Sequence, residues 1–135
     1  MSAFLVQIKN ATVYLKNTPV LKAIDWTLRS GEYWALVGNN GSGKTTLSKL
    51  IFGELVTIDG GSVHWFNSRT WNGLADIRER VGYVSAEYQE NYDRNVTGRE
   101  AVESGFFASI GLWQKANARQ KQRAEECLHL LKSNT

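Results

Sequence analysis

Residues 38–46 constrain this chain more than any other stretch, because they read Gly-Asn-Asn-Gly-Ser-Gly-Lys-Thr-Thr. This order fits the pattern G-x-x-x-x-G-K-[ST] of the phosphate-binding Walker A loop. Glycines let such a loop turn tightly and bring its N–H groups close to an anion. The lysine supplies a mobile positive charge for the β- and γ-phosphates, and the next hydroxyl is suited to ligate Mg²⁺. The predicted binding residues are Gly38, Asn39, Asn40, Gly41, Ser42, Gly43, Lys44, Thr45 and Thr46, with Lys44 also as the catalytic group and Thr45 as the Mg²⁺ ligand.

The sequence on either side supplies the context that this motif requires. Residues 33–37 (Tyr-Trp-Ala-Leu-Val) form a short apolar run, which is typical of a buried parallel strand. Behind the loop, apolar residues recur at helical spacing and predict a helix from about Lys44 to Gly53. The positive end of that helix dipole would add to the phosphate site. Strand, glycine loop and helix together indicate an α/β fold.

The rest of the chain alternates between strand and helix signals. Predicted strands cover residues 4–8, 12–15, 24–29, 62–66 and 81–84, with a turn at Asn10–Ala11 between the first two. Residues 85–95 are polar and predict a loop. Predicted helices cover residues 74–80, 97–107 and 116–132, the second of which opens with a capping box formed by Thr97 and Glu100. Residues 110–113 are ambiguous.

Length and composition place the chain among soluble globular proteins. Its 135 residues suffice for one modest domain, and 42% hydrophobic with 21% charged residues is ordinary for this class. No run approaches the roughly 18 apolar residues of a membrane span. The net charge of +3 is read as a mildly basic surface, with no direct nucleic-acid partner. A single cysteine and the lack of a signal-peptide pattern favour a cytoplasmic location.

Taken in this order, residues 4–131 resemble the N-terminal part of an ATP-binding cassette (ABC) ATPase domain, which is a P-loop NTPase. The resemblance rests on the loop and on three further segments: the approach in residues 21–32, the glycine turn and strand in residues 59–63, and residues 76–84. It implies one partial domain. An antiparallel β subdomain would occupy residues 1–30, the P-loop core strands residues 31–84, and a Q-loop-like segment with the start of a helical subdomain residues 85–135.

The resemblance also implies a function. The chain would be the ATP-binding portion of an ABC-type ATPase, with ATP and Mg²⁺ as cofactors, coupling ATP hydrolysis to transport or another mechanical task in the complete protein. Its partners would be a second cassette or the missing C-terminal half, together with membrane transport subunits at the inner face of the membrane. Tyr14 lies where the family stacks an aromatic ring on adenine, and a half-buried strand tyrosine is the alternative.

The chain departs from the family pattern in two respects. The Q-loop glutamine is expected two residues after Val84, where Ala86 stands, and either Glu87 or Gln89 could replace it. The signature sequence, the Walker B aspartate, the catalytic glutamate and the switch histidine do not occur. We therefore expect a truncated cassette that, by itself, hydrolyses ATP slowly or not at all. We also expect the strand at residues 33–37 to need a partner that covers its unpaired edge.

Two alternatives stay open. Another P-loop enzyme, such as a nucleotide kinase or a GTPase, would share the loop. In kinases, however, the strand that precedes the loop usually lies almost at the start of the chain, whereas here several predicted strands come before it. The GTPase guanine motif N-K-x-D is not found. The second alternative is a non-catalytic fragment that pairs with a cassette partner.

Overall fold

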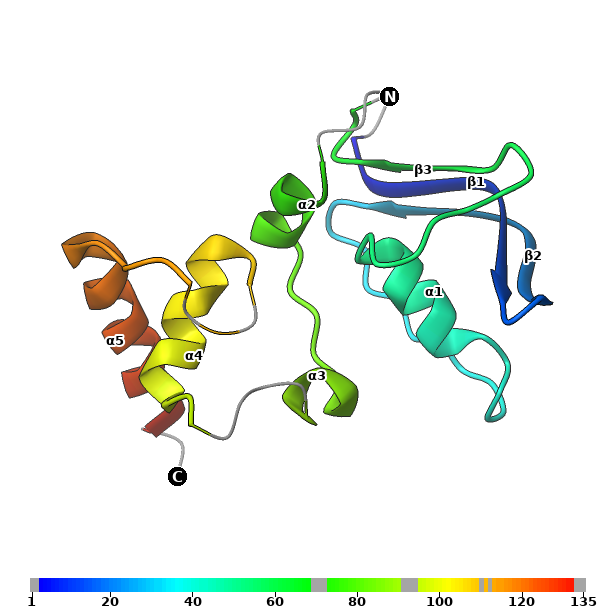
Figure 1. The fold of residues 1–135 in the computed structure, drawn as a ribbon. Helices are drawn as coiled ribbons and strands as arrows, with labels where there is room; N and C mark the ends of the chain where they lie inside the picture. The colour runs from blue at the N-terminus through cyan, green and yellow to red at the C-terminus, as the bar shows by residue number, and fades with distance from the viewer. Residues whose placement is uncertain (1–2, 69–72, 91–94, 110, 112, 133–135) are drawn as a thin grey trace. The chain divides into compact units, whose positions relative to one another are not determined.

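The computed structural model describes residues 3–68, 73–90, 95–109, 111 and 113–132 (Figure 1). These residues form two compact units, Met1–Ile77 and Arg78–Thr135, and each is described by itself. Within the described ranges, no helix is both long enough and apolar enough to cross a bilayer.

The first unit is built on a three-stranded antiparallel sheet in the order β2-β1-β3 (Figure 1). The strands are β1 (Phe4–Leu15), β2 (Thr18–Arg29) and β3 (Ser62–Trp65). Lys16 and Asn17 join β1 to β2 with φ values of 48° and 63°, as a two-residue hairpin turn requires. Inward-facing residues of β1 and β2 form the core with one helix residue. Its buried members are Val6, Ile8, Ala11, Val13, Leu21 and Leu50.

The predicted turn at Asn10–Ala11 is wrong, because β1 is one continuous strand with an irregularity at that point. Asn10 has a φ of 47°, and its N–H donates to Asp25 Oδ1 at 3.0 Å. On the facing strand Ala23 also has a φ of 47°, and its N–H donates to Thr12 Oγ1 at 3.2 Å. Side chains thus accept hydrogen bonds from the backbone N–H groups that do not pair between β1 and β2. The irregularity therefore bends and twists the strand without reversing the chain.

The predicted helix behind the glycine loop is confirmed as α1 (Lys44–Ile51), which ends two residues early. Its Leu50 is fully buried in the core below the sheet. Trp65 of β3 donates its indole N–H to the Ile51 carbonyl at 2.8 Å. This bond satisfies one of the open carbonyls at the helix C-terminus and ties α1 to the sheet.

Residues 33–37 do not form the predicted strand. They make no backbone–backbone hydrogen bond within the described chain, and the side chains of Tyr33 and Val37 are 99% and 89% exposed. The strand predicted at residues 81–84 is wrong in the same way, and Val84 is 98% exposed. A parallel strand takes its hydrogen bonds from its neighbours, so an apolar run cannot become one until a neighbour is present.

The second unit is helical. It contains α3 (Ala86–Glu90), α4 (Gly98–Ser104), the short 3₁₀ helix η1 (Gly105–Phe107) and α5 (Ala118–Lys132). The helix α2 (Leu74–Arg80) agrees with its predicted bounds and crosses the boundary between the units. The loop prediction for residues 85–95 is corrected by α3, where the Ser85 hydroxyl accepts the Tyr88 N–H at 3.2 Å.

In the second unit, α4 and α5 each begin at a reciprocal pair of hydrogen bonds, and the first of these is the predicted capping box. Thr97 and Glu100 form a capping box, in which the threonine hydroxyl accepts the Glu100 N–H and the carboxylate accepts the Thr97 N–H. Asn117 and Gln120 exchange a similar reciprocal pair of hydrogen bonds before α5. The ambiguous segment 110–113 lies partly outside the described residues.

Candidate phosphate-binding site

The glycine loop is a tight turn that leads directly into α1. Gly41 and Gly43 have φ values of 82° and 89°, in the left-handed region that side chains rarely adopt. The Ser42 N–H donates to the Asn39 carbonyl at 3.2 Å and closes the turn. Gly43 is the N-cap of α1, and its carbonyl accepts the Leu47 N–H at 2.9 Å. The loop therefore presents the open N–H groups of a helix N-terminus beside a tight turn.

Lys44 folds back over this loop. Its Nζ donates to the Gly38 carbonyl at 2.8 Å, to the Asn39 carbonyl at 2.7 Å and to Ser42 Oγ at 3.4 Å. These oxygens hold the ammonium group at the turn, where an anion bound to the loop would meet it. The positive charge of the site is thus positioned by the loop itself.

A cavity of about 370 Å³ lies along the loop and is lined by both polar and apolar groups. Its lining residues are Leu15, Val20, Asn40, Gly41, Gly43, Lys44, Thr45 and Thr46. The hairpin between β1 and β2 contributes the two aliphatic side chains. Convergent polar groups beside an apolar wall are the usual chemistry of a small-molecule site, and the loop makes phosphate the suitable anion.

The two threonines that follow Lys44 differ in access. Thr46 is 6% exposed and packs into the first unit, whereas Thr45 is exposed in the first turn of α1. Of the two, Thr45 therefore has the hydroxyl that a solvent-borne metal ion could reach. This is the residue that the motif predicts as the Mg²⁺ ligand.

Tyr14, the predicted adenine contact, is not among the residues that line the cavity. It pairs with Pro19 across the hairpin and is 45% exposed. Its neighbour Leu15 reaches the cavity instead, together with Val20. Sequence reasoning missed both aliphatic residues, because a strand pattern does not tell which residue of a hairpin will face a loop that is distant in sequence.

The residues predicted to replace the Q-loop glutamine belong to the second unit. Ala86 and Glu87 form the first turn of α3, and Glu87 is exposed. The replacement of the glutamine by Glu87 or Gln89 stays a prediction.

Comparison with known proteins identifies relatives along most of the chain. The family model described as ABC transporter matches residues 21–135. The ABC transporter ATP-binding protein ModF of Escherichia coli (strain K12) is 32% identical over 128 residues, which cover 93% of this chain and 26% of that protein. The zinc transport system ATP-binding protein TroB of Treponema pallidum (strain Nichols) is 32% identical over 127 residues, covering 94% of this chain and 46% of that protein. The chain thus spans between a quarter and a half of the length of these relatives.

Proposed function

Because the chain belongs to the ABC transporter family of ATP-binding proteins, we propose that residues 38–46 bind the phosphates of ATP, as the ATP-binding portion of an ABC-type ATPase. One observation carries the proposal. The Lys44 ammonium group lies 2.7–2.8 Å from two loop carbonyl oxygens, at the wall of a cavity that the loop and the helix N-terminus share. An ammonium group at this position suits a phosphate better than a neutral ligand.

Each group of the site has a role in this proposal. The N–H groups of the loop and of the first turn of α1 would hold phosphate oxygens, and Lys44 would stabilise the charge that develops on the transferred phosphoryl group. The exposed hydroxyl of Thr45 is an oxygen ligand of the kind that Mg²⁺ takes. When bound, Mg²⁺ would neutralise phosphate charge. Leu15 and Val20 would flank the nucleoside, with the ring of Tyr14 stacking on adenine beside them.

In this proposal the chain is better suited to bind ATP than to hydrolyse it. Ala86 carries a methyl group where the family pattern expects a glutamine that contacts Mg²⁺ and the attacking water. A methyl group can neither ligate a metal nor orient water. The chain by itself therefore holds the nucleotide and turns it over slowly or not at all. In the complete protein, hydrolysis would drive transport or another mechanical task through a second cassette and membrane subunits on the cytoplasmic side.

Titration calorimetry with ATP and MgCl₂ tests the proposal. Lys44→Ala should weaken binding about tenfold or more, because it removes charge-assisted hydrogen bonds to phosphate. Lys49→Ala is the matched control, since Lys49 lies on the same helix and pairs with Glu54 at 3.9 Å. Equal affinity of the wild type and Lys44→Ala would refute a Walker A role. Tighter binding of GTP than of ATP, or phosphoryl transfer to an added nucleoside monophosphate, would instead favour another P-loop enzyme.

The exposed run at residues 33–37 favours a second function, that of a non-catalytic fragment which pairs with a cassette partner. Its side chains are apolar, and its backbone makes no ladder hydrogen bonds within the described residues. Such a segment is a template for strand addition. Sedimentation velocity across a range of concentrations checks this: association that is lost when Leu36 is replaced by lysine supports it, and a monomer at all concentrations contradicts it.

A further inference from the structure

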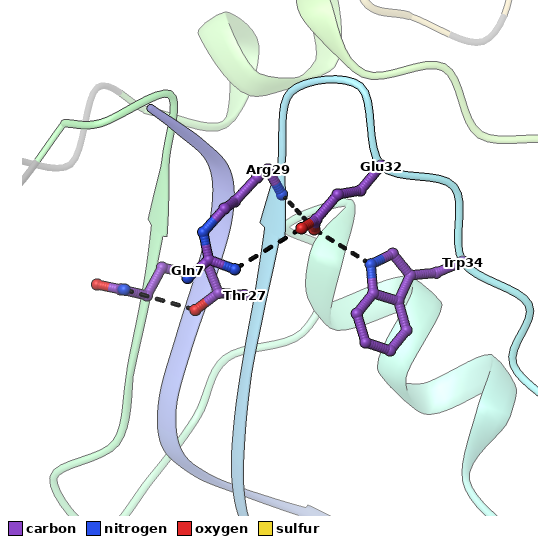
Figure 2. Close-up of polar contacts among 5 residues, drawn as sticks. All are labelled: Gln7, Thr27, Arg29, Glu32 and Trp34. Carbon is purple, nitrogen blue, oxygen red and sulfur yellow. Dashed lines mark hydrogen bonds and ion pairs between the residues drawn. The ribbon is translucent and has the colours of Figure 1, made fainter. Parts of the chain in front are cut away.

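The segment that leads from the sheet to the phosphate loop is tied back at one point, the carboxylate of Glu32 (Figure 2). Its Oε2 accepts two hydrogen bonds, from the Arg29 backbone N–H at 2.9 Å and from the Trp34 indole N–H at 3.3 Å. Its Oε1 faces the guanidinium of Arg29 at 3.8 Å. One side chain thus bridges the end of β2 and the start of the loop segment.

The indole that Glu32 holds also contacts the sheet. The Trp34 ring meets Trp26 edge to face, with ring centroids 5.8 Å apart and planes at 82°. This is a favoured arrangement for two aromatic rings. Trp26 lies on β2 and packs against the hydrophobic core of the first unit. The carboxylate therefore orients Trp34 so that its ring lies against a residue that belongs to the core.

These side-chain contacts matter because the segment after Glu32 lacks the ladder hydrogen bonds of a strand in the described structure. Residues 33–37 make no backbone–backbone hydrogen bonds, and Tyr33 and Val37 are almost fully exposed. Gly38, whose carbonyl accepts the Lys44 ammonium, follows directly. Glu32 and Trp34 therefore hold the start of the segment that enters the phosphate loop.

We infer that Glu32 is a positioning residue, a carboxylate latch that holds Trp34 on Trp26 and thereby sets the path of the chain into the phosphate loop. The inference rests on the proposed function only for its effect on nucleotide affinity. Opening the latch loosens the loop and weakens phosphate binding without touching any group that contacts the ligand. The pKa of the Glu32 carboxyl lies below its ordinary value, chiefly because of the backbone hydrogen bond from Arg29, with further contributions from Trp34 and the Arg29 charge.

Three variants separate the parts of the latch. Glu32→Ala removes every contact of the carboxylate, whereas Glu32→Gln keeps an oxygen acceptor for the indole and removes the charge. Trp34→Phe keeps a ring against Trp26 and removes the donor. Glu54→Ala is the matched control, because Glu54 is a carboxylate of the same unit that pairs with Lys49 away from the latch.

Two readouts are independent of nucleotide. Near-UV circular dichroism reports the coupled indoles of Trp26 and Trp34, and hydrogen exchange reports the amides of residues 38–47. Glu32→Ala should lose the coupled signal and speed loop exchange about threefold or more, as the loss of ordinary hydrogen bonds does. Trp34→Phe should also speed loop exchange. The wild-type signal should fall as the pH drops through the lowered pKa of Glu32, whereas Glu32→Gln should give a signal that does not titrate in this range.

Each outcome decides the inference. Circular dichroism and exchange in Glu32→Ala that match Glu54→Ala would overturn it, and so would an acid titration that persists in Glu32→Gln. A titration of the same variants with ATP and MgCl₂ forms a separate arm, in which Glu32→Ala should bind more weakly than Glu54→Ala. A wild type that binds no ATP would refute the proposed function, while the two nucleotide-independent readouts would still decide the latch.

Discussion

Alanine in place of Gly43 should destabilise the first unit much more than alanine in place of Gly41. Both glycines have left-handed φ values, 89° and 82°. They differ in their surroundings. A Cβ on Gly43 would lie 3.1 Å from Leu21 Cδ2 and 3.3 Å from the Val20 carbonyl oxygen, whereas a Cβ on Gly41 would meet nothing within 4 Å. The pair therefore separates the cost of the backbone conformation from the cost of close packing.

The magnitude follows from these two contributions. The left-handed conformation costs an ordinary residue roughly 1–2 kcal/mol, and both variants share this term. Crowding in a packed site adds typically about 1–3 kcal/mol, and this term applies to Gly43 alone. Leu21 is buried in the core and the other neighbour is a backbone atom, so neither can move aside freely. Gly43→Ala should thus exceed Gly41→Ala by about 1–3 kcal/mol in the free energy of unfolding.

Urea unfolding followed by tryptophan fluorescence measures this difference, since Trp26, Trp34 and Trp65 all lie in the first unit. The two variants should show equal urea slopes and different midpoints. If the two free energies of unfolding differed by less than about 0.5 kcal/mol, well below the expected crowding cost, the close packing of the β1–β2 hairpin on Gly43 would be refuted.

Two further predictions concern the core of the first unit and the N-cap of a helix in the second unit. Leu50→Ala should lower the free energy of unfolding of the first unit by about 2–5 kcal/mol, because this side chain is fully buried between α1 and the sheet; calorimetry and urea titration check this. Thr97→Ala should reduce helicity in the second unit, because it breaks the capping box of α4. The hydrogen bonds from Thr97 lower the pKa of the Glu100 carboxyl, so this capping contribution is present above the ordinary pKa and is lost as the pH falls through the lowered one. Far-UV circular dichroism from pH 7 to pH 3 should show a loss of helix in the wild type that is reduced in Thr97→Ala.

Local features of the site could be predicted from the sequence to a large extent. The glycine loop and α1 form where the motif places them, since a tight turn and a helix N-terminus depend on interactions within a few residues. The cap at Thr97 and Glu100 forms for the same reason. The irregularity at Asn10 was predicted as a turn, because the same residue preference serves turns and bulges. The sequence thus located the irregularity at Asn10 correctly but did not distinguish a turn from a bulge.

The cavity wall could not be predicted in this way. Tyr14 matches a family position, yet Leu15 is the residue of that strand that lines the cavity. Which side chain faces the loop depends on the twist and register of the hairpin and on how the hairpin packs over Gly43. The packing over Gly43 brings together residues more than twenty positions apart, and the pattern within a strand does not contain such contacts.

By itself, the sequence determined the glycine loop, the helix that follows it and the cap of α4, because each depends on bonds within one or two turns of chain. It also indicated the family, through the order of its motifs. Only the tertiary structure decided the fate of residues 33–37. Their apolar pattern is that of a parallel strand, but a strand exists through hydrogen bonds to a neighbour, and the described chain supplies none. Within this run, Trp34 is instead held by the Glu32 carboxylate and by the ring of Trp26, a combination that depends on where β2 ends and not on any periodicity.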